Sequence, residues 1–235
     1  MCGFIQRVTD SPAVIALLEE VGLQHTIPLF KDEANQSNVI NFYPAFGRVA
    51  TKRITNLIVN HSTGIDATWW FDAKPNGETL EIGERTTFNA RNIDSPYWKK
   101  AIHHRRGIVV ATAIGESNPS LGGKGKSHYL MQPECGVLLL GAVYRIFSNG
   151  AYSCAVVTRP PIDGFSKYHE KSIPCFLPHN KDMINAWLQN DMNYEVEQLL
   201  ATPKLYTDLR ITQVKTFKGA EPTSSSEILR ATDKA

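Results

Sequence analysis

The residue with the most unusual chemical potential is Cys2, which follows the initiator methionine and precedes Gly3. Removal of that methionine leaves Cys2 as a free terminus with an amine and a thiol on adjacent carbons. These groups titrate near ~8 and ~8.5, so both are nucleophilic close to neutral pH. The amine can condense with an aldehyde to an imine, which the thiol closes to a five-membered thiazolidine. Alternatively, the amine can act as base for thiol attack on an amide.

Three other polar residues follow strand-like segments and could assist such a nucleophile. Asn89 follows the segment TTF, Glu116 ends the apolar segment GIVVATAIG, and His169 follows the segment CAVVT after a short loop with Pro and Gly. An amide can hold an amine, a carboxyl group at the end of an apolar strand can have a raised pKa, and imidazole titrates in the useful range. Each residue alone is also typical of a purely structural role. Their combination with Cys2 favours a catalytic site.

The order of these residues resembles the SOS response-associated peptidase family, the SRAP domain. Cys2-Gly3, Asn89-Ala90-Arg91, Glu116 and His169 before Ile173-Pro174 carry the resemblance. Further matches are Asn41 and Pro44 in NFYP, Trp69-Trp70, Thr158 and Trp187-Leu188. The resemblance extends from Cys2 to about Lys218, so it covers nearly the whole chain.

The resemblance implies a protein that binds single-stranded DNA and attacks the ring-opened aldehyde of an abasic site. A stable thiazolidine DNA–protein crosslink results and shields the lesion. Cys2 would be the nucleophile, Asn89 would orient its amine, and Glu116 would shuttle protons. His169 would act as acid, base and sugar-phosphate contact, and Arg91 would bind phosphate, for which guanidinium is well suited.

The remaining matched residues are candidates for the DNA-binding surface. Trp69 and Trp70 are expected either beside an unstacked base or in the core. Asn41, Pro44 and Thr158 are assigned to the same surface through the resemblance. The family name also implies peptidase activity, and Cys2 with Glu116 would support self-cleavage of a short leader.

The chain departs from the family pattern at several positions. Phe4 stands where the family commonly has Arg, which removes a phosphate contact unless Arg7 replaces it. Ser117 stands where a Trp commonly follows the acid, and Asn92-Ile93-Asp94 replaces the usual continuation of the Asn-Ala-Arg motif. The segment before Pro174 is one residue longer than usual. These changes predict a divergent branch with an altered preference for DNA structure.

Hydrophobic periodicity predicts one α+β domain: a mainly antiparallel or mixed, curled, barrel-like sheet with peripheral helices. Helices are expected over 11–22, 95–107, 180–190 and 193–201, and strands within 38–60, 107–115, 127–131, 136–147, 151–158 and 205–216. We expect the SRAP-like domain to span 2–218 and residues 219–235 to form a polar, flexible tail.

Composition narrows the class of protein. The 235 residues are 42% hydrophobic with a net charge of +2, which excludes a disordered polymer and leaves DNA binding open. No apolar run approaches the length of a membrane span, and acids interrupt the only candidate signal segment. The four cysteines show no CxxC spacing, so we expect a reduced, cytoplasmic protein that is associated with the nucleoid when bound to DNA. We also expect a monomer, and we expect the three cysteines other than Cys2 to be buried.

No cofactor is expected. The segment Lys124-Gly125-Lys126-Ser127 resembles a nucleotide-binding loop, but Ser120 occupies the position of its first glycine. Adjacent histidines 103 and 104 cannot face one metal on a helix, and no Cys/His spacing matches a zinc motif.

Two alternatives remain open. Glutamine amidotransferases also begin Met-Cys-Gly, although here Asn76-Gly77 has no matching Arg-Gly ahead of it. A non-catalytic protein that binds single-stranded DNA is the other, because WKKAIHHRR (98–106) is basic and aromatic. The same stretch is equally compatible with a solvated helix face.

Overall fold

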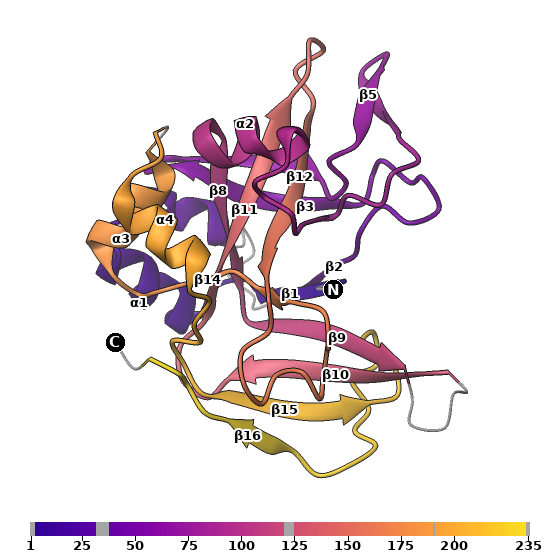
Figure 1. Cartoon of the computed structure of the whole chain (residues 1–235), viewed down its shortest axis with the longest axis vertical. Helices are drawn as coiled ribbons and strands as arrows, with labels where there is room; N and C mark the ends of the chain where they lie inside the picture. The colour runs from indigo at the N-terminus through magenta and orange to yellow at the C-terminus, as the bar shows by residue number, and fades with distance from the viewer. Residues whose placement is uncertain (1–2, 32–37, 120–124, 190, 234–235) are drawn as a thin grey trace.

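The computed structural model describes residues 3–31, 38–119, 125–189 and 191–233. Within them, five strands close into a barrel because β12 pairs with both β4 and β11 (Figure 1). These strands are β3 (Arg53–Asn60), β4 (Thr63–Thr68), β8 (Arg106–Ala111), β11 (Leu138–Ile146) and β12 (Tyr152–Arg159). The barrel is mixed, since β4 and β12 are parallel and the other pairs antiparallel.

A second sheet packs beside the barrel and has the order β16-β15-β10-β9-β1-β2. Its strands are β1 (Phe4–Val8), β2 (Val39–Phe42), β9 (Ala113–Pro119), β10 (Lys126–Pro133), β15 (Leu209–Val214) and β16 (Glu227–Leu229). The segment GIVVATAIG, expected to form one strand, is divided between the two sheets as β8 and β9. Thr112 lies at the division and donates its backbone N–H to the Gln6 oxygen at 2.8 Å.

Helices cover the outside of the barrel, as expected. They are α1 (Pro12–Glu20), the 3₁₀ helix η1 (Gln24–Phe30), α2 (Pro96–His104), α3 (Lys181–Leu188) and α4 (Tyr194–Ala201). Figure 1 shows α1, α3 and α4 on one side of the barrel, with α2 above it. Asn180 and Asn193 cap α3 and α4 by accepting the N–H groups of Met183 and Val196. The predicted α+β architecture is therefore confirmed.

Short strands complete the fold. They are β5 (Ala73–Asn76), β6 (Thr79–Ile82), β7 (Asn89–Ala90), β13 (Ile173–Pro174) and β14 (Phe176–Leu177). Strands β7 and β13 flank β12 at the end of the barrel where the candidate site lies. In the described parts of the chain, no helix is long and apolar enough to cross a membrane.

The C-terminal segment differs from the expected loose tail. Strand β16 pairs with β15, and Thr223 donates its backbone N–H to the Gln213 oxygen at 2.8 Å. Ion pairs such as Lys167–Glu227, at 2.6 Å, connect the segment to the domain. A polar composition concealed this pairing because an edge strand needs few apolar residues.

The cysteines also differ in part from the expectation. Cys154 and Cys175 are free and buried, but Cys135 is exposed. Burial raises the pKa of the Cys175 thiol to about 12, so this cysteine remains a thiol at neutral pH.

Candidate active site

The pairing of β1 with β9 brings the start of the chain to the strand that carries Glu116. Phe4 lies opposite Gly115, and Ile5 lies opposite Ile114. Gly3 donates its backbone N–H to the Gly115 oxygen at 3.5 Å, so it lies beside the Gly115–Glu116 peptide. Cys2 itself lies outside the described residues.

Glu116 has the perturbed acidity expected of a proton shuttle. Its side chain is fully buried, and desolvation raises its pKa from 4.5 to about 7. The positive charge of Arg91 acts in the opposite direction and limits the rise. The carboxyl group can therefore donate or accept a proton near neutral pH.

His169 is held as a neutral imidazole. Burial lowers its pKa from 6.5 to about 4, and the charge of Arg91 contributes to the decrease. Its Nδ1 accepts the backbone N–H groups of Lys171, at 3.3 Å, and Ser172, at 3.2 Å. Because Nδ1 is the acceptor, the proton of the neutral ring is assigned to Nε2. His169 can thus offer a neutral N–H donor.

Asn89 and Arg91 come from β7 and the residues that follow it. Asn89 is 7% exposed and pairs in parallel with Val156 of β12. Arg91 is exposed and donates from Nη2 to the Ser172 hydroxyl at 3.2 Å. Since the Ser172 backbone also donates to His169, one serine connects the predicted phosphate ligand with the predicted acid–base residue.

A cleft of about 450 Å³ joins these elements. Its lining is Gly3, Phe46, Phe88, Arg91, Gly115, Ser117, Asn118, Pro119, Lys126, His169, Glu170, Lys171 and Phe217. Both residues that flank Glu116 in the sequence belong to this lining. The predicted group around Glu116, Arg91 and His169 is therefore assembled at one place.

The cleft also contains cations and aromatic rings beyond the predicted site residues; the sequence indicated Lys126 as a basic residue for single-stranded DNA, but gave no signal for Lys171 or Phe46. Lys126 and Lys171 are exposed cations, and Phe46 is 50% exposed. Phe46 contacts Phe88 edge to face, with ring centroids 5.0 Å apart. Aromatic rings beside cations can stack bases and hold phosphates of single-stranded nucleic acids.

Phe217 lies in the region of Phe4 and Ser117, two of the positions at which the chain departs from the family pattern. Its ring stacks on Phe4 at 4.9 Å, with an interplanar angle of 13°. It also contacts His128 edge to face, and the Nδ1 of His128 lies 2.8 Å from the Ser117 hydroxyl. A Cβ atom on Gly115 would come within 2.6 Å of the Phe217 ring, so this close approach requires glycine. An aromatic residue thus reaches the cleft from the far end of the chain.

The tryptophans favour the packing alternative. Trp69 is fully buried, and its Nε1 donates to the Phe88 oxygen at 2.8 Å. Trp70 is 6% exposed and stacks on Phe88 at 5.8 Å. Neither ring lines the cleft. They support the aromatic wall through Phe88 instead of presenting a face to a base.

Arg7 does not replace the phosphate contact that is lost at Phe4. Arg7 is 1% exposed and donates to the carbonyl and hydroxyl oxygens of Thr55. Its guanidinium also lies over the rings of Phe30 and Phe42. A phosphate cannot reach it without unfolding of this region.

Asn41, Pro44 and Thr158 do not line the cleft. Asn41 accepts a hydrogen bond from Gln6, and Pro44 is buried. Thr158 is fully buried opposite Pro174 in the pairing of β12 with β13. These three residues belong to the surrounding scaffold.

The two segments that suggested the alternative interpretations lie outside the lining of this cleft. Asn76 ends β5 and Gly77 begins the exposed turn to β6, and neither residue lines the cleft. In the basic stretch 98–106, Arg106 is the first residue of β8; it is buried and donates to carbonyl oxygens that include those of Trp187 and Ile102. Arg106 therefore supports the fold and is not a phosphate ligand.

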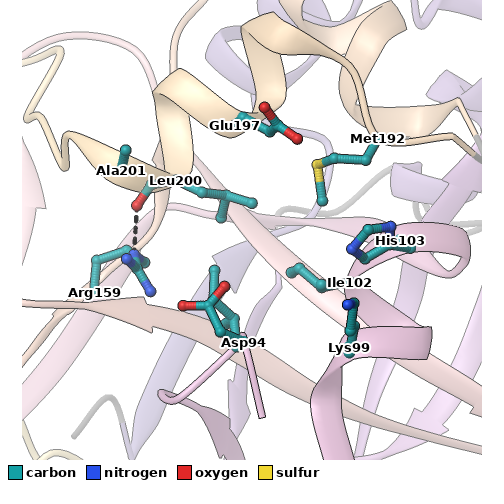
Figure 2. Close-up of a pocket in the computed structure, with 10 residues that line it drawn as sticks. Asp94, Lys99, Ile102, His103, Arg159, Met192, Glu197, Leu200 and Ala201 are labelled. Carbon is teal, nitrogen blue, oxygen red and sulfur yellow. Dashed lines mark hydrogen bonds between the residues drawn. The ribbon is translucent and has the colours of Figure 1, made fainter. Parts of the chain in front are cut away.

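Figure 2 shows a separate pocket of about 310 Å³ between α2 and α4. Lys99, His103 and Arg159 line it together with the acids Asp94 and Glu197. Arg159 donates to the Leu200 oxygen at 2.6 Å. Mixed charge does not favour a polyanion, and none of the predicted catalytic residues is present. Among the described residues, no group of three or more His, Cys, Asp or Glu could hold a metal.

A family model and several solved structures of similar fold match this chain. The family model described as "SOS response associated peptidase (SRAP)" matches residues 1–218. A solved protein from Bacteroides thetaiotaomicron is 14% identical, with 92% of this chain and 93% of that chain covered and a TM-score of 0.58. One from Bordetella bronchiseptica is 16% identical, with 92% and 100% covered and a TM-score of 0.60. A phage-related protein from the same organism is 18% identical, with 96% and 100% covered and a TM-score of 0.58. No curated protein matches the chain.

Proposed function

Because this chain belongs to the SOS response associated peptidase (SRAP) family, we propose that it captures abasic sites in single-stranded DNA by covalent attachment to Cys2. Family membership supports a function associated with DNA damage. The abasic-site chemistry, its residues and its strand specificity are the proposal. They rest on the assembly of Glu116, His169 and Arg91 beside the first described residue, Gly3.

The proposed linkage requires only condensation and ring closure. The Cys2 amine adds to the aldehyde carbon of the ring-opened abasic sugar, and loss of one water forms an imine. The thiol sulfur then bonds to the imine carbon, its proton passes to nitrogen, and a thiazolidine results. No oxidant or reductant is needed. Gly3, the residue that follows Cys2 in the sequence, lines the cleft.

Glu116 is proposed to move the protons of these steps. Loss of water from the amine adduct requires an acid, and ring closure requires transfer of the thiol proton. A carboxyl group with a pKa of about 7 exists in both protonation states near neutral pH. Asn89, also buried at this end of the barrel, is proposed to orient the amine through its amide.

His169 and Arg91 are proposed to bind the sugar and phosphate. The neutral His169 ring offers its Nε2–H as a hydrogen-bond donor to the ring oxygen of the abasic sugar. The proton that this oxygen gains on ring opening comes from the acid form of Glu116. Arg91 pairs with phosphate through its exposed guanidinium, and its bond to Ser172 limits its conformations. Lys126 and Lys171 add phosphate contacts, and Phe46 and Phe217 offer rings to the neighbouring bases.

The peptidase activity in the family's description is proposed to act on the bond before Cys2. Thiol attack on the Met1 carbonyl transfers the acyl group to sulfur, and hydrolysis then releases methionine and the free amine. Mass spectrometry of protein translated with methionine aminopeptidase inhibited tests this step. A retained Met1 would contradict self-cleavage but would leave the crosslinking proposal intact.

One observation carries the crosslinking proposal: β1 pairs with the strand that holds the buried, near-neutral carboxyl group of Glu116. Tandem mass spectrometry of the protein after incubation with an abasic oligonucleotide and nuclease digestion tests it. We expect the adduct on the N-terminal peptide, with the mass of the lesion fragment less one water. An adduct on a lysine side chain, or none, would contradict the assignment.

A further inference from the structure

A second cleft, of about 540 Å³, lies between α2 and the outer end of β11. Its lining is Phe71, Pro96, Tyr97, Lys100, Ala101, Arg105, Tyr144, Arg145 and Ile146. In Figure 1, α2 and the β11–β12 hairpin lie above the barrel, whereas β9 and β10 lie below. The two clefts share no lining residue. This second cleft is therefore separate from the candidate active site, and we call it the α2 cleft.

The charge of the α2 cleft is entirely positive. Lys100, Arg105 and Arg145 contribute cations, and the lining contains no carboxylate. None of the three cations forms an ion pair with a residue in the described parts of the chain. Asp72 influences Tyr97 electrostatically but does not line the cleft. A polyanion would therefore meet attraction without a competing internal acid, unlike in the pocket of Figure 2.

Aromatic rings lie near these cations, since the charge of Arg105 acts on Tyr144 and that of Arg145 on Tyr97. Both tyrosines are half-buried, but Arg85 already lies over the Tyr97 ring, 5.5 Å from its centroid, so Tyr144 offers the more accessible ring. Phe71 is 5% exposed and contacts Tyr97 edge to face at 5.8 Å. An accessible ring beside cations matches a nucleotide, which has a planar base and a phosphate. Simple phosphate would use only the cations.

The elements that carry these groups are held firmly. Tyr144 donates its backbone N–H to the Arg105 oxygen at 2.9 Å, which joins β11 to the end of α2. Arg106 donates to the oxygens of Ile102 and His103 and so holds the last turn of α2. A fixed backbone beneath the cations reduces the entropy lost when a ligand binds.

We propose that the α2 cleft is a second binding site for nucleotides of single-stranded DNA, distinct from the cleft that holds the lesion. The inference rests on the proposed function, because that function makes single-stranded DNA the ligand at hand. Lys100, Arg105 and Arg145 bind phosphates, and Tyr144 stacks on a base. The site adds affinity for longer strands and takes no part in the chemistry at Cys2.

The test measures fluorescence anisotropy of an undamaged oligothymidylate of roughly twenty nucleotides, which excludes any contribution from crosslinking. The variants are Lys100→Gln, Arg145→Gln and Tyr144→Leu. Lys99→Gln is the matched control, because Lys99 is the exposed neighbour on α2 and lines the other pocket. We expect each test variant to weaken binding about threefold or more, with a shallower salt dependence for the two charge variants. Lys99→Gln should have little effect.

The proposal is overturned if Lys100→Gln and Arg145→Gln weaken binding no more than Lys99→Gln does. It is also overturned if free thymidine monophosphate displaces the strand as effectively as unlabelled oligothymidylate at the same total concentration of nucleotides. The ligand would then be the free nucleotide. Crosslinking of a short abasic oligonucleotide, measured in parallel, separates the two proposals. If the protein crosslinks normally but the test variants lose no affinity for the strand, only the second site is rejected. If the protein does not crosslink but the test variants lose affinity as expected, only the abasic-site function is rejected.

Discussion

Phe4 and Gly115 lie opposite each other in the antiparallel pairing of β1 with β9, which ties the start of the chain to the strand of Glu116. This contact depends on the division at Thr112, where the chain leaves the barrel and enters the second sheet. Phe217 covers the same pair, stacked on Phe4 and in close approach to Gly115. The terminus, the buried acid and an aromatic wall are thus parts of one arrangement.

The rate of crosslinking should depend on pH in two directions. Attack requires the neutral Cys2 amine, which titrates near ~8, so the rate rises with pH at first. The acid form of Glu116 is lost above its pKa of about 7, so the rate then falls. Glu116→Gln should remove the falling limb and slow the reaction about a hundredfold near neutral pH. Single-turnover rates by denaturing electrophoresis measure this, with Glu170→Gln as control from the same cleft. An unchanged profile for Glu116→Gln would rule out its proposed role.

Stability should change with pH in a way that identifies Glu116. Its pKa is raised from 4.5 to about 7. The stability that the protonated carboxyl group contributes to the folded state is therefore fully present below pH 4.5 and is lost as the pH rises through 7. The loss is on the order of 3 kcal/mol. The melting temperature of Glu116→Gln minus that of wild type should therefore be larger at pH 8 than at pH 5. Thermal melts followed by circular dichroism measure this difference.

His169 provides the opposite control. Its pKa is lowered from 6.5 to about 4, so its contribution is present above pH 6.5 and is lost as the pH falls through 4. The melting temperature of a His169→Asn variant should rise relative to that of wild type only at acid pH. A difference between wild type and Glu116→Gln that stays constant across the range would contradict the buried-carboxyl account.

Arg91 should contribute a phosphate contact that salt can reveal. Arg91→Gln is expected to weaken binding of undamaged single-stranded DNA and to reduce the slope of log affinity against log salt by about 0.7. Anisotropy titrations over a range of salt concentrations measure the slope. Arg53→Gln is the control, since Arg53 is exposed on β3 and lies outside the cleft lining. Equal slopes for Arg91→Gln and wild type would place Arg91 away from the phosphates.

Phe217 should determine how the strand lies in the cleft. Phe217→Leu keeps an apolar side chain against Phe4 but removes the planar ring, so affinity for an abasic strand should fall about fivefold or more. Phe217→Tyr should retain most of the affinity. Thermal melts confirm that both variants fold, and equal affinities for both would show that the ring does not contact DNA.

The sequence predicts the barrel and its helices because their apolar periodicity is strong, as in α1 and β11. It also predicts Glu116, Arg91 and His169 at one site through the resemblance. Phe217 escaped prediction because it contacts Phe4 from more than two hundred residues away, and one aromatic in a polar segment gives no local signal. Trp69 shows the converse, because its residue type suits base stacking but its side chain is buried and donates a hydrogen bond to the Phe88 oxygen.

The most direct test uses protein whose N-terminal residue has been verified as Cys2. This protein is incubated with an abasic single-stranded oligonucleotide and heated, and the products are separated by denaturing electrophoresis. Cys2→Ala and Cys2→Ser keep the amine but lack the thiol, so each should yield only an imine that borohydride must trap. The account predicts a heat-stable shifted band from wild type alone. No such band from wild type, or an equally stable band from Cys2→Ala, would contradict it.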